Sequence, residues 1–290
     1  MSGSYERPAL RYHGGKWRLA PWIIGHFPEH RVYVEPFGGS ASVLFRKPRS
    51  YGEVYNDLDE EIVNVFRVAQ DPAACARLQA LLEVTPFARL EFELAYKAST
   101  DPVERARRAI IRSFQGFSSA SVSRVHKTEF RSNASRNGTY PAMDWARYPG
   151  ALGAWLERLR GVVIECRDGL EVIRQHDRAD ALIYADPPYV QATRRDPRWK
   201  RNYRHNLDDE QHAQLAEVLR AAEGYVVLSG YRSALYDDLY GGWVRVETDS
   251  CTDCHHPGQR NIRTTECLWL SPRTADAAGR LFGEVMEVGR

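Results

Sequence analysis

Apolar residues along this chain follow two patterns, and the boundary between the patterns divides the sequence. In the first, short apolar runs that end in an acid or a turn are separated by segments of helical period, as residues 58–70 illustrate. The predicted strands of this kind cover residues 31–36, 53–57, 161–166, 181–185 and 225–229. Helices are predicted between them at residues 18–26, 58–70, 169–176, 208–222 and 233–240. This alternation predicts an α/β fold with a parallel sheet.

After residue 70 the alternation stops and helical segments follow one another. Helices are predicted over residues 73–83, 87–97 and 103–114, and residues 115–141 form a long polar stretch without an apolar period. Residues 243–248 and 263–270 predict an antiparallel pair that closes the sheet. We therefore expect one domain made of residues 1–70 and 161–290, with a mainly helical domain inserted at residues 71–160. A single large α/β domain is the alternative that a length of 290 residues leaves open.

Composition agrees with a soluble globular protein. Hydrophobic residues make up 43% and charged residues 27%, which suits a chain with a sizeable core. No apolar run approaches the eighteen residues of a membrane span, and the N-terminus has no apolar segment of the kind found in signal peptides. The sequence therefore predicts a cytoplasmic protein with no membrane partner.

The net charge of +2 is too small to indicate a nucleic-acid-binding protein, but the charge is unevenly distributed. Residues 105–136 carry eight basic side chains against one acid, and residues 194–204 carry six against one. Both segments could contact phosphates, and the alternative is a pair of solvated surfaces. The candidate DNA contacts are Arg112, Arg124, Lys127, Arg131, Arg136, Arg194 and Arg195.

The strongest candidate chemistry follows the apolar run 181–185, where the sequence reads Asp186-Pro187-Pro188-Tyr189. Two consecutive prolines fix the backbone, so the Asp186 carboxylate and the Pro187 carbonyl are expected to point outward as acceptors. Two acceptors beside the ring of Tyr189 suit an exocyclic amine on a flat heterocycle, since the amine offers two hydrogens and the heterocycle can stack. The alternative is a strand that ends in an acid and a proline-stiffened turn.

Glycines mark two further candidate binding segments. Tyr12-His13-Gly14-Gly15-Lys16 places free backbone amides beside a cation at a predicted helix start, which favours an anion. A phosphate loop is excluded because an earlier glycine is missing and Trp17 stands where Ser or Thr would hold magnesium, so a carboxylate is the better guest. A glycine turn with a solvated lysine is the alternative.

The second segment, Glu35-Pro36-Phe37-Gly38-Gly39, follows a predicted strand, and its small residues let a ligand approach the backbone. Asp57 lies nineteen positions after Gly38, about the distance at which an acid binds ribose hydroxyls in nucleotide-binding units. Because no GxGxxG motif is present, an adenosine-containing cofactor is favoured over a dinucleotide. Asp168 is a third acid at the end of a predicted strand.

Cysteine usage argues against a disulfide framework, since five cysteines are spread along the chain. Cys251, Cys254, His255 and His256 have zinc-ligand side chains, but they crowd into six positions and no second pair completes a usual spacing. We interpret this cluster as part of a polar loop near DNA. We therefore expect no metal, and a structural zinc site remains the alternative.

With these motifs in this order, the sequence resembles the Dam-like DNA adenine-N6 methyltransferases of the alpha group, particularly the phage-type members. The motifs that carry the resemblance are Tyr12 to Lys16, Glu35 to Gly39, Asn56-Asp57, Asp168-Gly169 and Asp186 to Tyr189. The inserted region lies between Asp57 and Asp168. The resemblance covers nearly the whole chain. One departure is His13, where many members of that group have a small residue.

The resemblance implies a class I methyltransferase fold, a Rossmann-like mixed sheet, that binds S-adenosylmethionine and carries an inserted target-recognition domain. Tyr12 and Lys16 would contact the methionine end of the cofactor, and Asp57 would hold its ribose. Asp168 would lie near the cofactor's adenine, and Asp186 would touch both the cofactor and the target amine. The remaining cofactor-lining residues would be Glu35, Pro36, Phe37, Gly38 and Gly39.

The implied activity is transfer of a methyl group to the N6 amine of an adenine that has left double-stranded DNA, with Tyr189 stacking on the base. Asp186, Pro187, Pro188 and Tyr189 would be the catalytic residues. Methylation of cytosine N4 or of an RNA amine is the alternative within enzymes, and a catalytically silent DNA-binding regulator is the alternative outside them. The sequence leaves open the recognition site, a monomer or weak homodimer, and a role in restriction–modification, in a phage or in chromosomal regulation.

Overall fold

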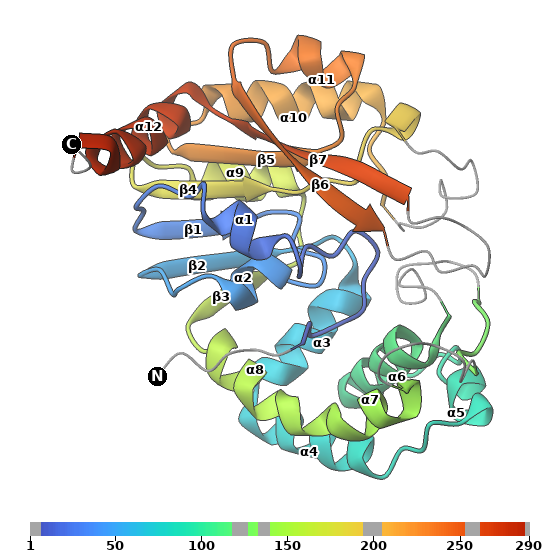
Figure 1. Ribbon diagram of the computed structural model, residues 1–290. Coiled ribbons are helices and arrows are strands. Elements are labelled where there is room, and N and C mark those ends of the chain that lie inside the picture. Colours follow the sequence, from blue (N-terminus) through green and yellow to red (C-terminus); the bar gives the residue numbers. More distant parts are fainter. Residues whose placement is uncertain (1–6, 118–126, 133–139, 194–204, 253–261, 288–290) are drawn as a thin grey trace.

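The computed structural model describes residues 7–117, 127–132, 140–193, 205–252 and 262–287. Its centre is a seven-stranded sheet in the order β3-β2-β1-β4-β5-β7-β6 (Figure 1). The strands are β1 (Val32–Glu35), β2 (Gly52–Asn56), β3 (Val162–Glu165), β4 (Ala181–Ala185), β5 (Tyr225–Gly230), β6 (Val244–Thr252) and β7 (Ile262–Leu270). The five predicted strands and the predicted closing pair are all present.

The first five strands are parallel, and β7 pairs antiparallel with both β5 and β6. This arrangement confirms the predicted α/β fold of class I methyltransferase type with antiparallel closing strands. The strand order reverses between β1 and β4, which are neighbours in the sheet but far apart in the sequence. A crevice forms at the carboxyl ends of parallel strands where the order reverses, so this is the expected position of a ligand site.

Alternate residues of each strand face opposite sides of the sheet, and each side has its own apolar core. Tyr33, Leu182 and Leu268 pack on one side with α1 (Ala20–Ile24) and α2 (Ser42–Arg46). Val34, Ile183 and Trp269 pack on the other side. That second side is covered by α9 (Gly169–His176), α10 (Asp209–Ala221) and α11 (Ala234–Leu239), while α12 (Pro272–Glu287) contacts β5 and β7. Both faces are therefore buried, as a mainly parallel sheet requires.

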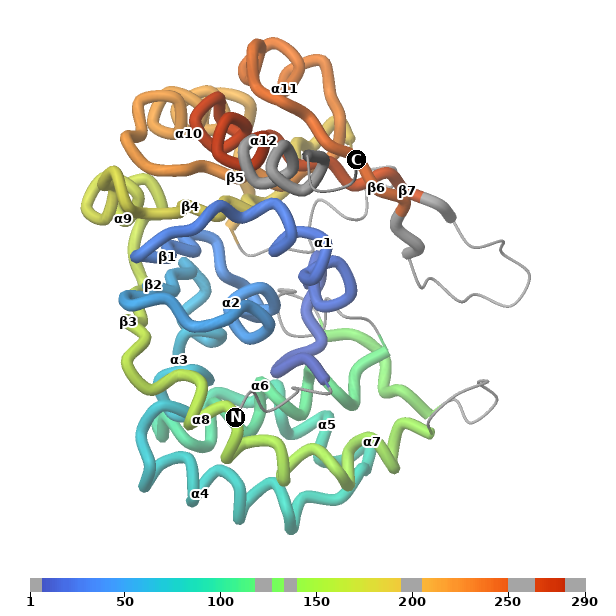
Figure 2. Tube along the Cα trace, turned by 60° about the vertical axis from the view of Figure 1, so that its left-hand side comes forward, coloured from blue at the N-terminus to red at the C-terminus, as the bar shows by residue number. Residues whose placement is uncertain are grey.

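A helical region lies between β2 and β3 in the chain and next to β3 at one edge of the sheet (Figures 1 and 2). It follows α3 (Glu60–Gln70) and consists of α4 (Pro72–Glu83), α5 (Arg89–Leu94), α6 (Pro102–Gln115), α7 (Pro141–Arg147), the 3-10 turn Pro149–Ala151 and α8 (Leu152–Leu159). α3 packs against α4, α6 and α8, and its apolar residues belong to the same core as one face of the sheet. The division at residues 71–160 remains a prediction, because this core is continuous across it.

Aspartates fix the starts of three of these helices. Asp59, Asp71 and Asp101 accept hydrogen bonds from backbone amides in the first turns of α3, α4 and α6. Capping of this kind contributes about 1 kcal/mol per helix because it satisfies amides that have no partner within the helix. It also explains why the helix starts could be predicted from the sequence to within two residues.

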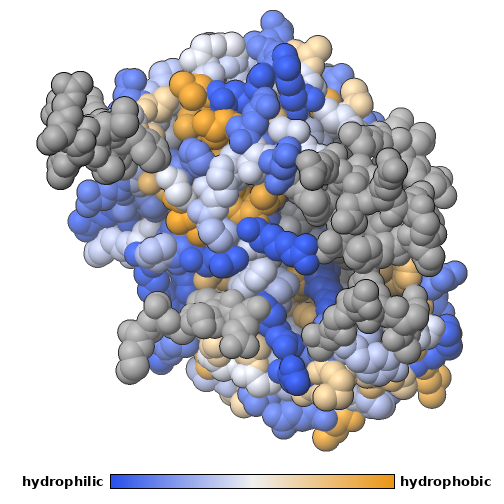
Figure 3. All heavy atoms as spheres, viewed as in Figure 1, coloured by the Kyte–Doolittle hydropathy of each residue, from blue (hydrophilic) through white to orange (hydrophobic). Residues whose placement is uncertain are grey.

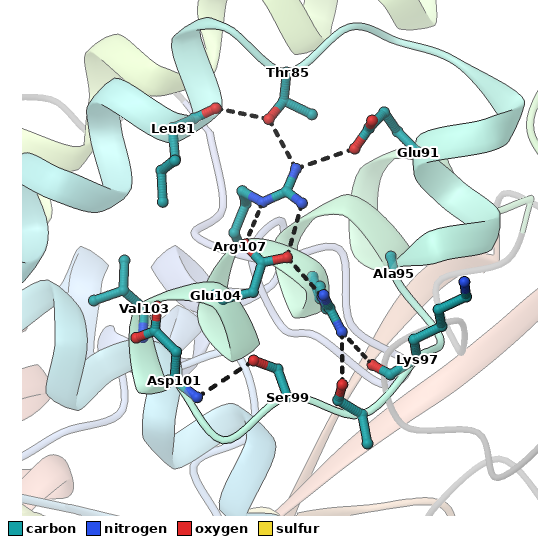
Figure 4. A network of polar contacts seen from close by, with 12 residues as sticks. Leu81, Thr85, Glu91, Ala95, Lys97, Ser99, Asp101, Val103, Glu104 and Arg107 are labelled. Carbon is teal, nitrogen blue, oxygen red and sulfur yellow. Dashed lines mark hydrogen bonds and ion pairs between the residues drawn. The ribbon is translucent and has the colours of Figure 1, made fainter.

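Arginines of α6 are held by acids inside the helical region. Arg107 bonds both oxygens of Glu104 and reaches Glu91 at 3.1 Å and the hydroxyl of Thr85 at 3.0 Å (Figure 4). Arg105 binds Glu61 of α3 at 2.6 Å. Much of the first basic segment is thus neutralised within the fold, and its formal charge overstates what it offers to DNA.

Arg112 is used inside the protein. Its side chain is only 8% exposed, donates to the Ala95 carbonyl at 2.6 Å and lies 3.3 Å from Glu61. These contacts join α6, α3 and the end of α5 and argue against a DNA contact at this residue, which stays a prediction. A run of basic residues in the sequence does not reveal which of them form ion pairs with acidic side chains on neighbouring helices.

A second buried ion cluster joins the sheet to α8. The Lys47 ammonium lies 2.6 Å from Glu53 Oε1, and Arg158 binds both oxygens of Glu53 and the carbonyl of Leu44. All three charged side chains are nearly inaccessible to solvent. The two cations keep the pKa of Glu53 below its usual value, although burial alone would raise it. We refer to Lys47, Glu53 and Arg158 below as the structural ion cluster.

Candidate functional site

A cavity of about 840 Å³, including the part open to solvent, lies at the carboxyl ends of β1 and β4. Its wall is formed by four stretches at residues 12–16, 35–43, 57–59 and 184–188, with Gly169, His205 and Leu207 at its margin. These stretches are separated in the sequence but meet where the strand order reverses. The space-filling view shows mainly hydrophilic side chains along the middle of this face, between the sheet and the helical region (Figure 3).

The turn after β1 forms one wall and requires its glycines. A Cβ atom on Gly38 would lie 2.1 Å from the ring of Tyr55, and one on Gly39, which has a φ of +48°, would lie 2.9 Å from the ring of Tyr12. The Tyr55 hydroxyl donates to the Gly39 carbonyl at 2.7 Å, and this hydrogen bond helps to fix the conformation of the turn. Glycine is therefore required at both positions, and the backbone of this turn lines the cavity.

Asp57 stands beside this glycine turn. Its carboxylate accepts from the Gly39 amide and from the Asp59 amide, both at 2.8 Å, so its orientation is fixed. Burial raises the pKa of Asp57 to about 6 despite these hydrogen bonds. Each carboxylate oxygen keeps acceptor capacity, which is what a pair of ribose hydroxyls requires.

Lys16 connects the cavity to the Asp186 motif. Its ammonium donates to the Gly14 carbonyl at 2.8 Å, lies 2.8 Å from Asp186 Oδ2, and stands 4.8 Å from the centre of the Tyr189 ring. Burial alone would lower the pKa of Lys16, but Asp186 and the nearby Glu266 outweigh this effect and raise it. Lys16 is therefore held as an ammonium ion although only 5% of it is exposed.

Asp186 is a buried acid of the cavity with one carboxylate oxygen lacking a hydrogen bond of good geometry. Burial raises its pKa, and the ion pair with Lys16 opposes that rise. Only Oδ2 takes part in this ion pair, and the buried Oδ1 has no hydrogen-bond partner among the residues that the structure describes. A buried acceptor without a partner is costly in a stable protein and marks a position intended for a ligand.

Glu35 contributes a second buried acid to the same cavity. The Tyr33 hydroxyl donates to its Oε2 at 2.8 Å, and the Leu44 amide donates to the same atom at 3.2 Å. Burial raises the pKa of Glu35 to about 8, and repulsion from Asp186 adds to the rise. A cationic group in the cavity would favour the ionised form of this acid.

Nine of the ten predicted cofactor residues line this cavity, as do three of the four predicted catalytic residues. Asp168 is the first exception: it caps α9 through the amides of Leu170 and Glu171, while its neighbour Gly169 lines the cavity. Tyr189 is the second, because it lies beyond the cavity wall with its ring against Lys16. The assigned roles of these residues remain predictions.

The remaining candidates lie at the surface or outside the described residues. Lys127 is about half exposed and lies 3.6 Å from Glu93, and Arg131 is partly buried after an isolated bridge between Gly116 and Phe130. Arg124, Arg136, Arg194, Arg195, Cys254, His255 and His256 lie outside the described residues. Within the described part of the chain no three His, Cys, Asp or Glu side chains group as metal ligands would, and no helix there has the length and apolar character needed to cross a membrane.

Sequence reasoning did not identify several residues of the site. Ser40, Ser42, Tyr184, His205 and Leu207 line the cavity, and Glu266 of β7 lies behind the motif. Glu266 carried a usable signal, because it shares a strand face with Leu268 and Leu270, which are buried in the core. An acid on the apolar face of a strand is uncommon unless it has a partner.

Comparison with known proteins gives a consistent result. The DNA adenine methylase of Salmonella typhi is 24% identical over 244 residues, covering 81% of this chain and 84% of that protein. The DNA adenine methylase of Escherichia coli is 24% identical over 229 residues, covering 76% and 77%. The Type II methyltransferase M.MjaIII of Methanocaldococcus jannaschii is 22% identical over 273 residues, covering 82% and 89%.

The family comparison covers the cavity and the motif together. The family described as D12 class N6 adenine-specific DNA methyltransferase matches residues 12–250, a range that runs from the first cavity residue, Tyr12, into β6. The match spans far more than half of the chain and includes β1 to β5 and the helical region between β2 and β3. On this basis the chain belongs to the D12 class N6 adenine-specific DNA methyltransferase family.

Proposed function

We propose that this protein transfers a methyl group from S-adenosylmethionine to the N6 amine of an adenine turned out of double-stranded DNA. The observation that carries the proposal is Asp186, whose Oδ2 is held by Lys16 at the cavity while its buried Oδ1 has no partner among the described residues. One residue thus faces both the cofactor cavity and the position where an amine is needed.

The lining of the cavity supports this choice of cofactor. The turn at Gly38 and Gly39 leaves no room for side chains, which suits a nucleoside packed against backbone, and Asp57 beside it would bind the ribose. At the other end, Lys16 would attract the carboxylate of the methionine group and Glu35 its amino group. When bound, the cofactor supplies an electrophilic methyl group on a sulfonium centre.

The residues of the motif act on the target amine. The lone pair of adenine N6 is delocalised into the ring, so acceptors that draw on both amine hydrogens favour the pyramidal geometry in which that lone pair can react. Asp186 Oδ1 and the Pro187 carbonyl would be these acceptors, and Pro187 and Pro188 hold them rigidly. Orientation of this kind can lower a barrier by roughly 7–11 kcal/mol in favourable cases.

The base must leave the duplex to reach this site, since its N6 lies inside the helix stack. The Tyr189 ring would then stack on the flipped base. Contacts with the DNA backbone would come from the helical region and from the segment after the motif, with Arg124, Lys127, Arg131, Arg136, Arg194 and Arg195 as the candidates. In this proposal the helical region between β2 and β3 is the target-recognition domain.

The test is mass spectrometry of nucleosides from mixed-sequence duplex DNA that has been incubated with the purified protein and S-adenosylmethionine. We expect N6-methyldeoxyadenosine with the unaltered protein and none with Asp186→Ala. Asp238→Ala is the matched control, because Asp238 is an exposed acid of α11 that does not line the cavity. It should methylate at the unaltered rate.

The other outcomes separate the alternatives. N4-methyldeoxycytidine in place of the adenine product would contradict the base assignment while keeping the mechanism. Methylation of RNA but not of DNA would contradict the substrate. Measurable binding of S-adenosylmethionine with no methylated product from either nucleic acid would indicate a catalytically silent DNA-binding protein.

A further inference from the structure

A hydrogen-bonded group of side chains lies behind the catalytic motif, on strands that the mechanism above does not use. The Tyr189 hydroxyl donates to Oε2 of Glu266 at 2.8 Å and lies 3.2 Å from the Ser229 hydroxyl. Glu266 belongs to β7 and Ser229 to β5, so the tyrosine of the motif is held by the antiparallel end of the sheet. The tyrosine is therefore fixed at its backbone and at its far end.

Glu266 is an unusual residue to find in this position. It is only 6% exposed, and its neighbours two and four places along the strand, Leu268 and Leu270, are buried apolar residues. Burial raises the pKa of Glu266, and attraction to Lys16 and hydrogen bonds from Tyr189 and Tyr231 oppose that rise. Burying an acid at such a site costs free energy, so the presence of Glu266 calls for a functional explanation.

Both tyrosines that bind Glu266 are in contact with each other. The rings of Tyr189 and Tyr231 meet edge to face with their centres 4.6 Å apart, and the ammonium of Lys16 lies against the Tyr189 ring. Removal of the Glu266 acceptor would leave the Tyr189 hydroxyl with weaker contacts such as the one to Ser229, and the ring would be held less firmly between these neighbours. Glu266 accepts the shortest hydrogen bond of this hydroxyl and so contributes most to the orientation of the ring next to Asp186.

We propose that Glu266 is a positioning residue for methyl transfer, which fixes the Tyr189 ring through its hydroxyl so that the flipped base is held at the correct angle to Asp186. This inference rests on the proposed function and adds a residue of β7 to it. Glu266 does not touch the base or the cofactor in this account. It positions the base through Tyr189, and its charge also favours the ammonium form of Lys16.

The test uses three single variants and one double variant, each assayed for single-turnover methylation of DNA. Glu266→Leu removes the acceptor but keeps most of the bulk, Glu266→Gln keeps an acceptor oxygen, and Tyr189→Phe keeps the ring but removes the donor. We expect Glu266→Leu and Tyr189→Phe to slow the chemical step about 10- to 100-fold, the range that a misplaced reacting group costs. Glu266→Gln should recover most of the rate.

The double variant, Tyr189→Phe with Glu266→Leu, decides between positioning and simple stabilisation. If Glu266 acts through the Tyr189 hydroxyl, the second change removes nothing more, and the double variant should match the slower single variant within about 3-fold. Multiplying losses in the double variant would overturn the proposal. So would full activity in Glu266→Leu or in Tyr189→Phe.

Two further readouts distinguish positioning from damage to the fold or to cofactor binding. The affinity for S-adenosylmethionine should stay within about 3-fold in every variant, so that the loss appears in the rate and not in the KM of the cofactor. DNA with 2-aminopurine at the target adenine should still show the fluorescence change of base flipping, but with weaker quenching because the ring no longer stacks firmly. Loss of cofactor binding together with activity would assign Glu266 a structural role instead.

The outcomes also separate this inference from the proposed function. If the unaltered protein makes no methylated nucleoside, the proposed function fails and the inference fails with it. If the unaltered protein methylates adenine but the rate losses of the two single variants multiply in the double variant, the proposed function stands and the inference alone is wrong. If Glu266→Leu does not fold, Tyr189→Phe still tests the proposal, since an unchanged rate in that variant contradicts it.

Discussion

Two buried ion clusters in this protein contain similar residues but differ in how completely their charges are paired. In the structural ion cluster, Glu53 has both oxygens bound by Lys47 and Arg158, and its pKa is held below the usual value. In the cavity, Asp186 shares Lys16 with other acids, keeps one oxygen without a partner in the described structure, and has a raised pKa. The lysines differ in the same way: the pKa of Lys47 is lowered and that of Lys16 is raised.

The difference shows what each cluster contributes. A cluster with complete pairing holds elements together and has nothing left for a ligand. A cluster with more acids than cations stores an unfavourable interaction that a bound cation and a bound amine can relieve. Burial and charge alone therefore do not identify a functional site, and the unsatisfied oxygen of Asp186 matters because it lies at the cavity.

The largest expected effect comes from removing the acid of each cluster in turn. Asp186→Ala should reduce methylation at least about 1,000-fold, because it removes an acceptor that the proposed mechanism uses in the transition state, and should leave thermal stability nearly unchanged. Glu53→Ala should lower the free energy of unfolding by about 3–5 kcal/mol, because two buried cations lose their partner. Thermal melting and methylation assays on both variants measure the contrast.

The comparison would fail if the pattern were reversed. A strongly destabilised Asp186→Ala protein would show that this acid also holds the fold together. Normal stability in Glu53→Ala would show that the structural ion cluster contributes little.

The next largest effect concerns the glycine turn. Gly39→Ala adds a Cβ at a φ of +48° and 2.9 Å from the Tyr12 ring, whereas Gly242→Ala adds one at a φ of +87° with no heavy atom within 4 Å. Both should lose about 1 kcal/mol of stability from backbone strain. Only Gly39→Ala should also weaken binding of S-adenosylmethionine, by about 10-fold or more, as calorimetry can measure. Equal cofactor affinity in the two variants would contradict the assignment of the cavity.

A smaller effect should appear in the pH dependence of stability. The pKa of Glu35 is raised to about 8, so the folded protein binds a proton that the unfolded chain releases near its usual value. The folded state holds more protons between about pH 4.5 and pH 8, and stability due to this group therefore falls as the pH rises through that window.

Glu35→Gln removes this group from the balance, since a glutamine stays neutral and can still accept from Tyr33 and Leu44. Its stability relative to the unaltered protein should increase from pH 5 to pH 8, on the order of 2 kcal/mol. Denaturant unfolding at both pH values measures this difference. A difference that does not change with pH would show that Glu35 is ionised throughout.

The smallest expected effect, on DNA binding, distinguishes two basic residues of the segment 105–136. Lys127→Ala should weaken DNA binding a few-fold and reduce the salt dependence of binding by about one counterion, without loss of stability. Arg112→Ala should destabilise the protein, because Glu61 and the Ala95 carbonyl lose their partner, and should leave the salt dependence unchanged. Titrations at several salt concentrations check both, and a lower salt slope in Arg112→Ala would restore its role as a DNA contact.

The sequence was informative where a local pattern sets the outcome. Apolar runs that end in an acid or a turn predicted β1 to β5. Acids and glycines at strand ends, the glycine turn before Lys16 and the family resemblance together predicted nine residues of the cavity, because the carboxyl ends of parallel strands meet. Helix starts were predictable at Asp59, Asp71 and Asp101 because capping depends only on neighbouring residues.

The sequence was uninformative where contacts between residues far apart in the chain determine the structure. α7 and α8 have fewer than nine residues each and are stabilised by packing of Trp145, Tyr148 and Trp155, which no local pattern reveals. α12 contains Gly279 and Gly283, which weaken its helical signal, and the residue that precedes α2, Ala41, has a left-handed conformation. The partners of Arg112 and Glu266 lie 51 and 77 positions away, so only the folded chain brings them together.

The side chain of Asn56 has a consequence for how this protein can change over evolution. Its amide donates to the carbonyls of Pro36 and Arg167 and accepts from the Arg167 backbone amide at 2.9 Å. Asn56 ends β2 and Arg167 follows β3, the neighbouring parallel strand, so this one amide ties the carboxyl ends of both strands to the turn after β1. Helices between β2 and β3 can therefore be lengthened, shortened or exchanged while the ends of the two strands beside the cavity stay in register, so the two parts of the chain can change independently over evolution.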